Sequence, residues 1–157
     1  MKKKILMAVM TLMTLAGFSA GAVPFDESEE LSTIRGKTLD LSSLQGKPLV
    51  LVFWANWCVP CRKEVSLINN LYEEWYPKNV NFIGINEDEQ FEDAVAFVDR
   101  YGPQYQSLKD RNFAWAEKMK VNSLPQVIIL SSKGTEIFRG FEPPSPGQLK
   151  QIIQEET

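Results

Sequence analysis

The sequence has no histidine and only two cysteines. Without an imidazole, the chain cannot assemble a Ser-His-Asp triad, and two thiols alone do not make the usual ligand sets of zinc or haem. These familiar catalytic and metal-binding constellations are therefore excluded. Whatever chemistry the chain performs has to run without histidine.

Methionine and clustered positive charge are also scarce. Four of the five methionines lie within the first 22 residues, and only Met119 lies beyond them. A copper carrier built on Met and His ligands therefore lacks its ligands. The 17 Lys and Arg against 20 Asp and Glu give a net charge of -3, and no stretch gathers the dense basic run that phosphate binding requires. Nucleic acid is not an expected partner.

What is present is an ordinary globular composition over 157 residues, with 44% hydrophobic and 24% charged residues, which predicts about one domain. Residues Met1–Ala22 have the pattern of a secretory signal peptide: three lysines, an apolar stretch from Ile5 to Phe18 and an A-x-A site at Ala20-Gly21-Ala22. We expect a mature domain over 23–157 in the periplasm or another extracytoplasmic compartment. A membrane tether through an uncleaved signal is the alternative, although the stretch is shorter than the roughly 20 residues of a membrane span.

The mature chain alternates between strand and helix patterns, which predicts an α/β domain with a partly parallel sheet. A short N-terminal β extension over 26–46, with a turn at Gly36-Lys37, comes first. Strands are expected at 48–54, 80–86, 127–130 and 136–139, and the last two form an antiparallel hairpin. Helices are expected after Cys61 up to Pro77, over 91–101 and 112–119, and from Pro146, with Ser145 as the N-cap.

A Cys-x-x-Cys motif, Cys58-Val59-Pro60-Cys61, lies where the buried strand 48–54 passes into a helix. Unpaired N–H groups and the positive end of the helix dipole favour the thiolate there and lower its pKa. Cys58 is therefore the expected nucleophile. Cys61, one turn deeper and more shielded, is the expected resolving thiol. A disulfide that closes so small a ring removes little chain entropy, which favours a redox role over a structural one.

The other residues around the motif have less specific interpretations. Trp57 is expected to screen the thiols and to offer an apolar contact to substrate. Trp54, Trp75, Trp115 and the phenylalanines are expected in the core. The charged residues 62–64, which follow Cys61, are interpreted as a solvated helix face.

The segment from Trp57 to Glu64, together with Ser123-Leu124-Pro125-Gln126 before the strand 127–130, resembles the exported thiol:disulfide reductases of the TlpA/ResA type. The resemblance covers nearly the whole mature domain. It implies a thioredoxin fold, with a central mixed sheet flanked by helices. It also implies a cis-proline at Pro125 that packs against the cysteine pair, and a backbone contact from Leu124 to the substrate strand.

The sequence also departs from related patterns. Val52 occupies the position at which cytoplasmic thioredoxins have a buried Asp. The resemblance to ResA-like reductases assigns the acid/base role to Glu89, which follows the strand 80–86. A register two residues earlier would select Glu87 instead. A solvated acidic loop at the start of the next helix is the remaining interpretation.

The expected function is reduction of disulfides in client proteins by dithiol-disulfide exchange, with no bound cofactor or metal. The resemblance implies a membrane thiol-disulfide electron donor, and clients in cytochrome c maturation or metal-site assembly. The alternatives are a disulfide oxidase or isomerase, a Cu(I)-carrying binding protein of the same fold, and a binding module with a fixed disulfide. A thiol peroxidase is disfavoured because Ala55, and not Thr, lies three residues before Cys58.

Overall fold

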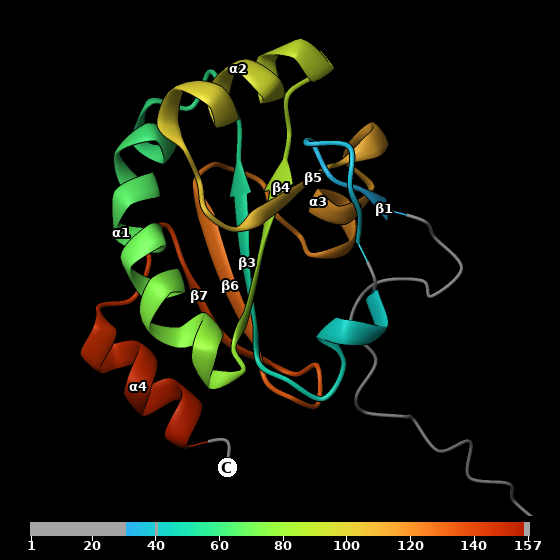
Figure 1. Cartoon of the computed structure of the whole chain (residues 1–157). Helices are drawn as coiled ribbons and strands as arrows, with labels where there is room; N and C mark the ends of the chain where they lie inside the picture. The colour runs from blue at the N-terminus through green and yellow to red at the C-terminus, as the bar shows by residue number, and fades with distance from the viewer. Residues whose placement is uncertain (1–30, 40, 156–157) are drawn as a thin grey trace, which may run out of the picture.

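The central strand of the sheet is β3, Leu49–Trp54, and all six of its residues are buried. An apolar run that is buried on both faces is typical of a strand with neighbours on both sides and other elements above and below. The structure is a computed structural model that describes residues 31–39 and 41–155. Within these residues, β3 forms the middle of a five-stranded sheet in the order β5-β4-β3-β6-β7 (Figure 1).

The sheet is mixed, and its topology brings three strand ends together at one end of the sheet. β4, Asn81–Asn86, runs parallel to β3, and β5, Gln106–Lys109, runs parallel to β4. β6, Gln126–Leu130, and β7, Glu136–Gly140, continue the sheet on the other side in antiparallel pairs. The carboxyl ends of β3 and β4 therefore lie at the same end of the sheet as the start of β6. This end of the sheet carries the cysteine motif, the acidic segment after β4 and the proline before β6.

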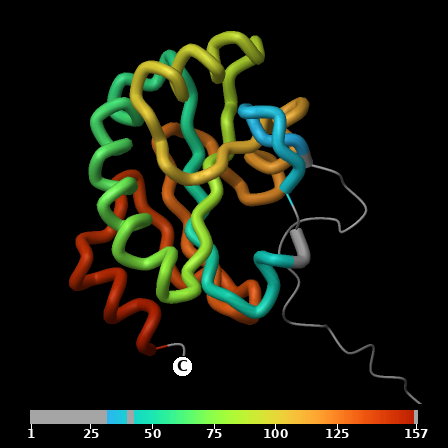
Figure 2. Tube along the Cα trace, in the orientation of Figure 1, coloured from blue at the N-terminus to red at the C-terminus, as the bar shows by residue number. Residues whose placement is uncertain are grey.

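Three helices cover one face of the sheet. The first core cluster joins the β3 residues Val50, Val52 and Trp54 to buried side chains of α1, α2 and α4. These helices are α1, Val59–Trp75; α2, Phe91–Tyr101; and α4, Pro146–Gln154. Figure 2 shows α4 lying alongside α1 at the C-terminal end of the chain.

The opposite face is covered by shorter elements. A second core cluster joins Leu49, Leu51 and Phe53 of β3 to the helix α3 and to Leu44. The elements on this side are α3, Ala114–Lys118, and the short 3-10 helices η1, Leu41–Leu44, and η3, Arg111–Phe113. A further 3-10 turn, η2, Tyr76–Lys78, follows α1.

The N-terminal extension is a small hairpin that attaches to the edge of the sheet. β1, Leu31–Ser32, pairs antiparallel with β2, Thr38–Leu39, and the turn between them uses Gly36 at φ +74°. The hairpin joins β5 through a bridge between Thr33 and Leu108. The predicted turn at Gly36-Lys37 is therefore confirmed.

The predicted elements of the main domain are confirmed, including the antiparallel pair β6–β7 and the Ser145 cap. The Ser145 Oγ accepts a hydrogen bond from the N–H of Gln148, and the Gln148 Oε1 accepts one from the N–H of Ser145, which together form a capping box. The edge strand β5 was not predicted, because its four residues contain one large apolar side chain, Leu108, and no strict alternation.

Two expectations about burial are wrong in part. Trp54 and Trp75 lie in the core as expected, but Trp115 is half-buried, and Phe91, Phe113 and Phe141 are exposed. The expected signal peptide, Met1–Ala22, lies outside the described residues. Within 31–39 and 41–155, no helix is both long enough and apolar enough to cross a membrane.

Candidate active site

The two cysteines form a disulfide at the N-terminus of α1. Cys58 is the N-cap of the helix, and its Sγ accepts the backbone N–H of Cys61 at 3.2 Å. Pro60 occupies the first turn, where a missing N–H costs no intrahelical hydrogen bond. The predicted arrangement is confirmed: the first sulfur lies at the positive end of the helix dipole, and the second lies one turn further along.

One part of that expectation is wrong, because the two cysteines do not differ in burial. Cys58 is 3% exposed and Cys61 is 4% exposed. Neighbouring segments cover the pair as a whole, so solvent access does not distinguish the two thiols. Their difference lies in the hydrogen bond, since Cys58 Sγ receives a helix N–H donor.

The turn that leads into Cys58 is held by polar side chains from other elements. The N–H of Asn56 donates to both carboxylate oxygens of Asp88, at 2.9 Å each. The guanidinium of Arg62 donates to the Asn56 carbonyl, from Nε at 3.0 Å and from Nη2 at 2.5 Å. Arg62 also lies over the Tyr101 ring, 5.9 Å from its centroid. Arg62 is therefore only partly solvated, and it connects α1 to the turn.

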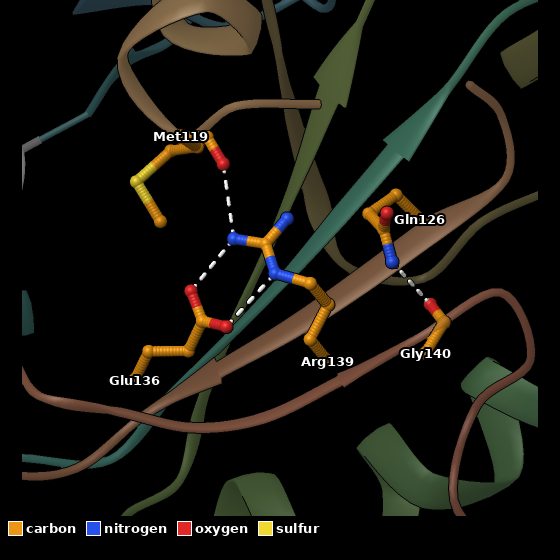
Figure 3. Close-up of polar contacts among 5 residues, drawn as sticks. All are labelled: Met119, Gln126, Glu136, Arg139 and Gly140. Carbon is orange, nitrogen blue, oxygen red and sulfur yellow. Dashed lines mark hydrogen bonds and ion pairs between the residues drawn. The ribbon is translucent and has the colours of Figure 1, made fainter. Parts of the chain in front are cut away.

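The Leu124-Pro125 peptide bond is cis, as the resemblance implied. Pro125 is buried, and Gln126 after it pairs with Phe53 of β3, so the proline lies beside the chain that leads to the cysteines. Gln126 also donates its side-chain amide to the Gly140 carbonyl at 2.7 Å, which attaches this segment to β7 (Figure 3).

Polar contacts of Arg139 connect β7 to the end of α3. Arg139 forms a two-point ion pair with Glu136, with distances of 2.6 and 2.8 Å, and donates to the Met119 carbonyl at 2.9 Å (Figure 3). Met119 itself packs against the second core cluster. In the part of the chain that the structure describes, no group of three or more His, Cys, Asp or Glu residues could hold a metal ion.

The structure separates the two acidic candidates that follow β4. Glu89 is exposed, in the loop before α2. Glu87 is 5% exposed, and its carboxyl group lies within hydrogen-bonding reach of the carboxyl group of Asp110, which is also buried. Its pKa is raised to about 8, because burial disfavours the charged form and the negative charge of Asp110 adds to this effect, while Lys109 opposes it.

Sequence reasoning missed a second buried carboxyl group, Glu64, three residues after Cys61. The expectation of a solvated helix face is wrong at this position, since Glu64 is buried and one of its oxygens has no partner within the described chain. Burial and the nearby charge of Glu142 raise its pKa to about 7. The available signal was the helical stripe, because Glu64 lies three residues after Cys61 and four before Ile68, both of which are buried.

A hollow of about 410 Å³ opens beside the cysteines and brings several of the predicted residues together. Trp57 and Leu124, both predicted to contact substrate, line it, and Glu87 lines it as well. Trp57 is 64% exposed, while Trp54 is buried and stacks on Phe97 with 4.2 Å between the ring centroids. The arrangement offers an apolar surface, a buried carboxyl group and a disulfide at one end of the sheet.

Known proteins are similar to this chain in sequence and in fold. A model of the AhpC/TSA family matches residues 24–135. Thiol-disulfide oxidoreductase ResA of Halalkalibacterium halodurans is 29% identical over 125 residues, covering 80% of this chain and 69% of the relative. ResA of Bacillus thuringiensis is 27% identical over 170 residues, covering 99% of this chain and 98% of the relative.

A solved structure agrees with these relatives. A secreted Mycobacterium tuberculosis disulfide oxidoreductase, homologous to E. coli DsbE, matches with a TM-score of 0.65 and 25% identity, covering 80% of this chain and 93% of the other. The Cys58–Cys61 pair lies on a thioredoxin fold, and thiol-disulfide exchange is the activity for which these relatives are named. The chain therefore belongs to the AhpC/TSA family, as a ResA-like thiol-disulfide oxidoreductase with a thioredoxin fold.

Proposed function

We propose that the chain is an exported reductase of protein disulfides, with Cys58 as the nucleophile and Cys61 as the resolving thiol. The observation that carries this assignment is the N–H of Cys61 donating to Cys58 Sγ at the start of α1. A donor hydrogen bond and the helix dipole both favour negative charge on that sulfur. Cys61 Sγ receives no such donor among the hydrogen bonds of the described residues, which supports the order of the two roles.

The reaction transfers two electrons from the enzyme dithiol to the client disulfide. The Cys58 thiolate attacks one client sulfur, forms a mixed disulfide and releases the second client sulfur as a thiolate, which takes up a proton. Cys61 then loses its proton and attacks Cys58 Sγ. The Cys58–client bond breaks, the client leaves fully reduced, and the enzyme is left with the Cys58–Cys61 disulfide.

Glu87 is the group that we assign to accept the proton of Cys61, in place of Glu89. A general base works best when its pKa lies near the working pH, and the raised pKa of Glu87, about 8, meets this condition. Glu87 also lines the hollow beside the cysteines, and its N–H donates to the carbonyl of Trp54 at 2.9 Å, which fixes it beside the end of β3. Glu89 lies in an exposed loop and lines a different hollow, with Lys109 and Arg111.

The residues between the cysteines support the reducing direction of electron flow. A strongly oxidising enzyme stabilises its thiolate heavily, often with a His in this position, and here the pair is Val59-Pro60. We therefore expect a reduction potential nearer that of thioredoxin, about -270 mV, than that of the oxidase DsbA, about -120 mV. A value close to the oxidase would reassign the chain as an oxidase or isomerase.

The cellular setting is proposed from the N-terminal pattern and from the relatives. The lysine-led apolar segment Met1–Ala22 and a relative described as secreted support export, to the periplasm or an equivalent compartment. A reductase in an oxidising compartment needs a supply of electrons, for which a membrane thiol-disulfide carrier is the expected donor. Cytochrome c maturation and metal-site assembly proteins are the proposed clients.

The deciding experiment is to trap clients with Cys61→Ser, which lacks the resolving thiol. Reduced Cys61→Ser protein should accumulate mixed disulfides through Cys58 when it is exposed to disulfide-bearing proteins, and mass spectrometry should locate the bond. Cys58→Ser is the matched control and should trap far less. The wild type should reduce insulin disulfides, and both variants should stay at background. More trapping by Cys58→Ser than by Cys61→Ser would show that the assigned roles are wrong.

A further inference from the structure

Two exposed aromatic side chains stand at the hollow beside the cysteines. Trp57, directly before Cys58, is 64% exposed, and Phe113, at the end of η3, is 46% exposed. The surface between them is mostly apolar, and we refer to this hollow as the aromatic groove. Its other apolar lining residues are Ala116, Val121 and Leu124, and the polar ones are the buried Glu87 together with Glu117, Asn122 and Ser123.

The backbone at Phe113 has an unfavourable conformation. Asn112 has φ 57° and ψ 27°, and Phe113 has φ 55° and ψ 27°, so two consecutive residues lie in the left-handed region. Asparagine visits this region readily, but for a bulky residue such as Phe it is an outlier. Backbone strain of this kind persists only where the surrounding structure imposes it, and it is concentrated at functional sites.

The surrounding structure does impose this conformation. Asp110 is buried, and its carboxylate accepts the N–H of Trp115 at 3.0 and 3.1 Å and the N–H of Ala116 at 2.9 Å. These bonds close the segment 110–116 on itself and satisfy helix N–H groups that would otherwise lack partners. The fold therefore holds an aromatic side chain at the surface in a conformation that costs stability, instead of burying it.

The position of the groove indicates what occupies it. It is continuous with the reaction site, because Trp57 precedes Cys58 and Leu124 precedes the cis-proline, and both line the groove. Any client whose disulfide reaches Cys58 carries its neighbouring residues across this surface. Most of the lining residues are apolar, and two of them are aromatic, so the matching group is a large apolar side chain.

We propose that Phe113 and Trp57 together bind a large apolar side chain of the client, next to the client's cysteine, and so give the enzyme a sequence preference. This inference rests on the proposed function, since it requires a protein disulfide as substrate. Phe113 is a specificity residue in this proposal, and it takes no part in the electron transfer.

The test compares client peptides that differ only beside the cysteine. Each peptide has an intramolecular disulfide and carries Trp, Leu, Gly or Asp at one position that flanks one of its cysteines, and the flanking positions are varied one at a time. Stopped-flow fluorescence of the reduced enzyme gives the second-order rate constant for each peptide. At the best flanking position we expect Trp and Leu peptides to react about 5- to 10-fold faster than Gly peptides, which corresponds to about 1.0 to 1.4 kcal/mol and lies within the range of aromatic contacts.

The variants separate the groove from other effects. Phe113→Gly removes the ring and suits the left-handed backbone, so it should fold, and it should reduce the Trp-to-Gly rate ratio to below about 2-fold. Phe113→Leu should restore part of the ratio. Phe91→Ala is the matched control, because Phe91 is another exposed phenylalanine that does not line the groove, and it should keep the full wild-type ratio.

The possible failures are distinguishable. A wild-type enzyme with no preference at any flanking position, or a Phe113→Gly enzyme with an unchanged ratio, overturns the groove proposal and leaves the reductase function intact. A wild-type enzyme that reduces neither the peptides nor oxidised glutathione overturns the proposed function itself. An equal loss of preference in Phe91→Ala would mean that the effect is not specific to the groove, and would also count against the proposal.

Discussion

The carboxylate of Asp88 receives the backbone N–H of Asn56 with both of its oxygens, at 2.9 Å each, across 32 residues of sequence. Asp88 is buried, and the Asn86 side chain donates a further hydrogen bond to it at 2.7 Å. A buried carboxylate that accepts several hydrogen bonds holds its donors in fixed positions. The turn before Cys58 is therefore positioned by the end of β4, and the cysteine pair depends on a residue from another strand.

We expect Asp88→Asn to lower the free energy of unfolding by about 1 to 3 kcal/mol, since one acceptor oxygen becomes a donor facing the Asn86 amide. Urea unfolding of the oxidised protein, followed by tryptophan fluorescence, measures this change. Asp93→Asn is the matched control, because Asp93 contacts the Asn56 side chain at 3.4 Å on the exposed surface. It should cost less than about 0.5 kcal/mol. Equal losses in both variants would contradict the positioning role of Asp88.

The raised pKa of Glu87 predicts a pH dependence of stability. With a folded pKa of about 8 against an ordinary value of 4.5, the folded state keeps a proton that the unfolded state releases. This contribution is fully present below pH 4.5, and it is lost as the pH rises towards 8. The wild type should therefore lose stability over this range relative to Glu87→Gln, by an amount on the order of a few kcal/mol.

The same two proteins also test the proposed acid/base assignment. Glu87→Gln should remove one ionisation from the pH profile of disulfide exchange, while Glu89→Gln, at the exposed position, should keep the wild-type profile. Urea unfolding at pH 4, 6 and 8 measures the free energy of unfolding predicted above. The rate of disulfide exchange is measured over the same pH range. A profile that responds to Glu89→Gln and not to Glu87→Gln would return the role to Glu89.

The contrast between Glu87 and Glu89 also shows where sequence reasoning reaches its limit. Cys58 and Pro125 could be predicted because their signals are local: a motif at a strand–helix junction, and a proline directly before a strand. The burial of Glu87 and Glu64 depends on which strands and helices pack over them, and spacing along the chain does not determine that. The left-handed backbone at Phe113 depends on hydrogen bonds to Asp110, which no local pattern announces.

Packing between distant segments also determines which residue fits at Gly84 of β4. A Cβ at this position would lie 2.3 Å from Ser107 Oγ and 2.8 Å from Trp54 Nε1. Trp54 is held by its stacking on Phe97, so it cannot move freely away. We expect Gly84→Ala to lower the free energy of unfolding by about 1 to 3 kcal/mol, as is usual for overpacking.

A double-mutant cycle tests the reason for this loss. Ser107→Ala removes the Oγ, a buried hydroxyl without a partner among the described residues, so by itself it should be neutral or slightly stabilising. Combined with Gly84→Ala it should recover part of the loss, with a coupling of about 1 kcal/mol measured by urea unfolding. Strict additivity of the two changes would mean that the contact with Ser107 is not the cause.

Lys120, the second residue after α3, offers a gain in stability. Its φ is 55°, and its N–H donates to the Glu117 carbonyl. Many α-helices end with one residue in this left-handed conformation, and glycine is preferred there. Lys120→Gly should raise the free energy of unfolding by about 0.5 to 1 kcal/mol, since relief of the left-handed conformation outweighs the added freedom of the unfolded chain. Lys150→Gly, the same change at an exposed position inside α4, should instead lose about 1 kcal/mol. Thermal or urea unfolding should therefore show changes of opposite sign in the two variants. A loss of stability in both variants would mean that the left-handed backbone at Lys120 is not strained. It would also weaken the argument for backbone strain at Phe113.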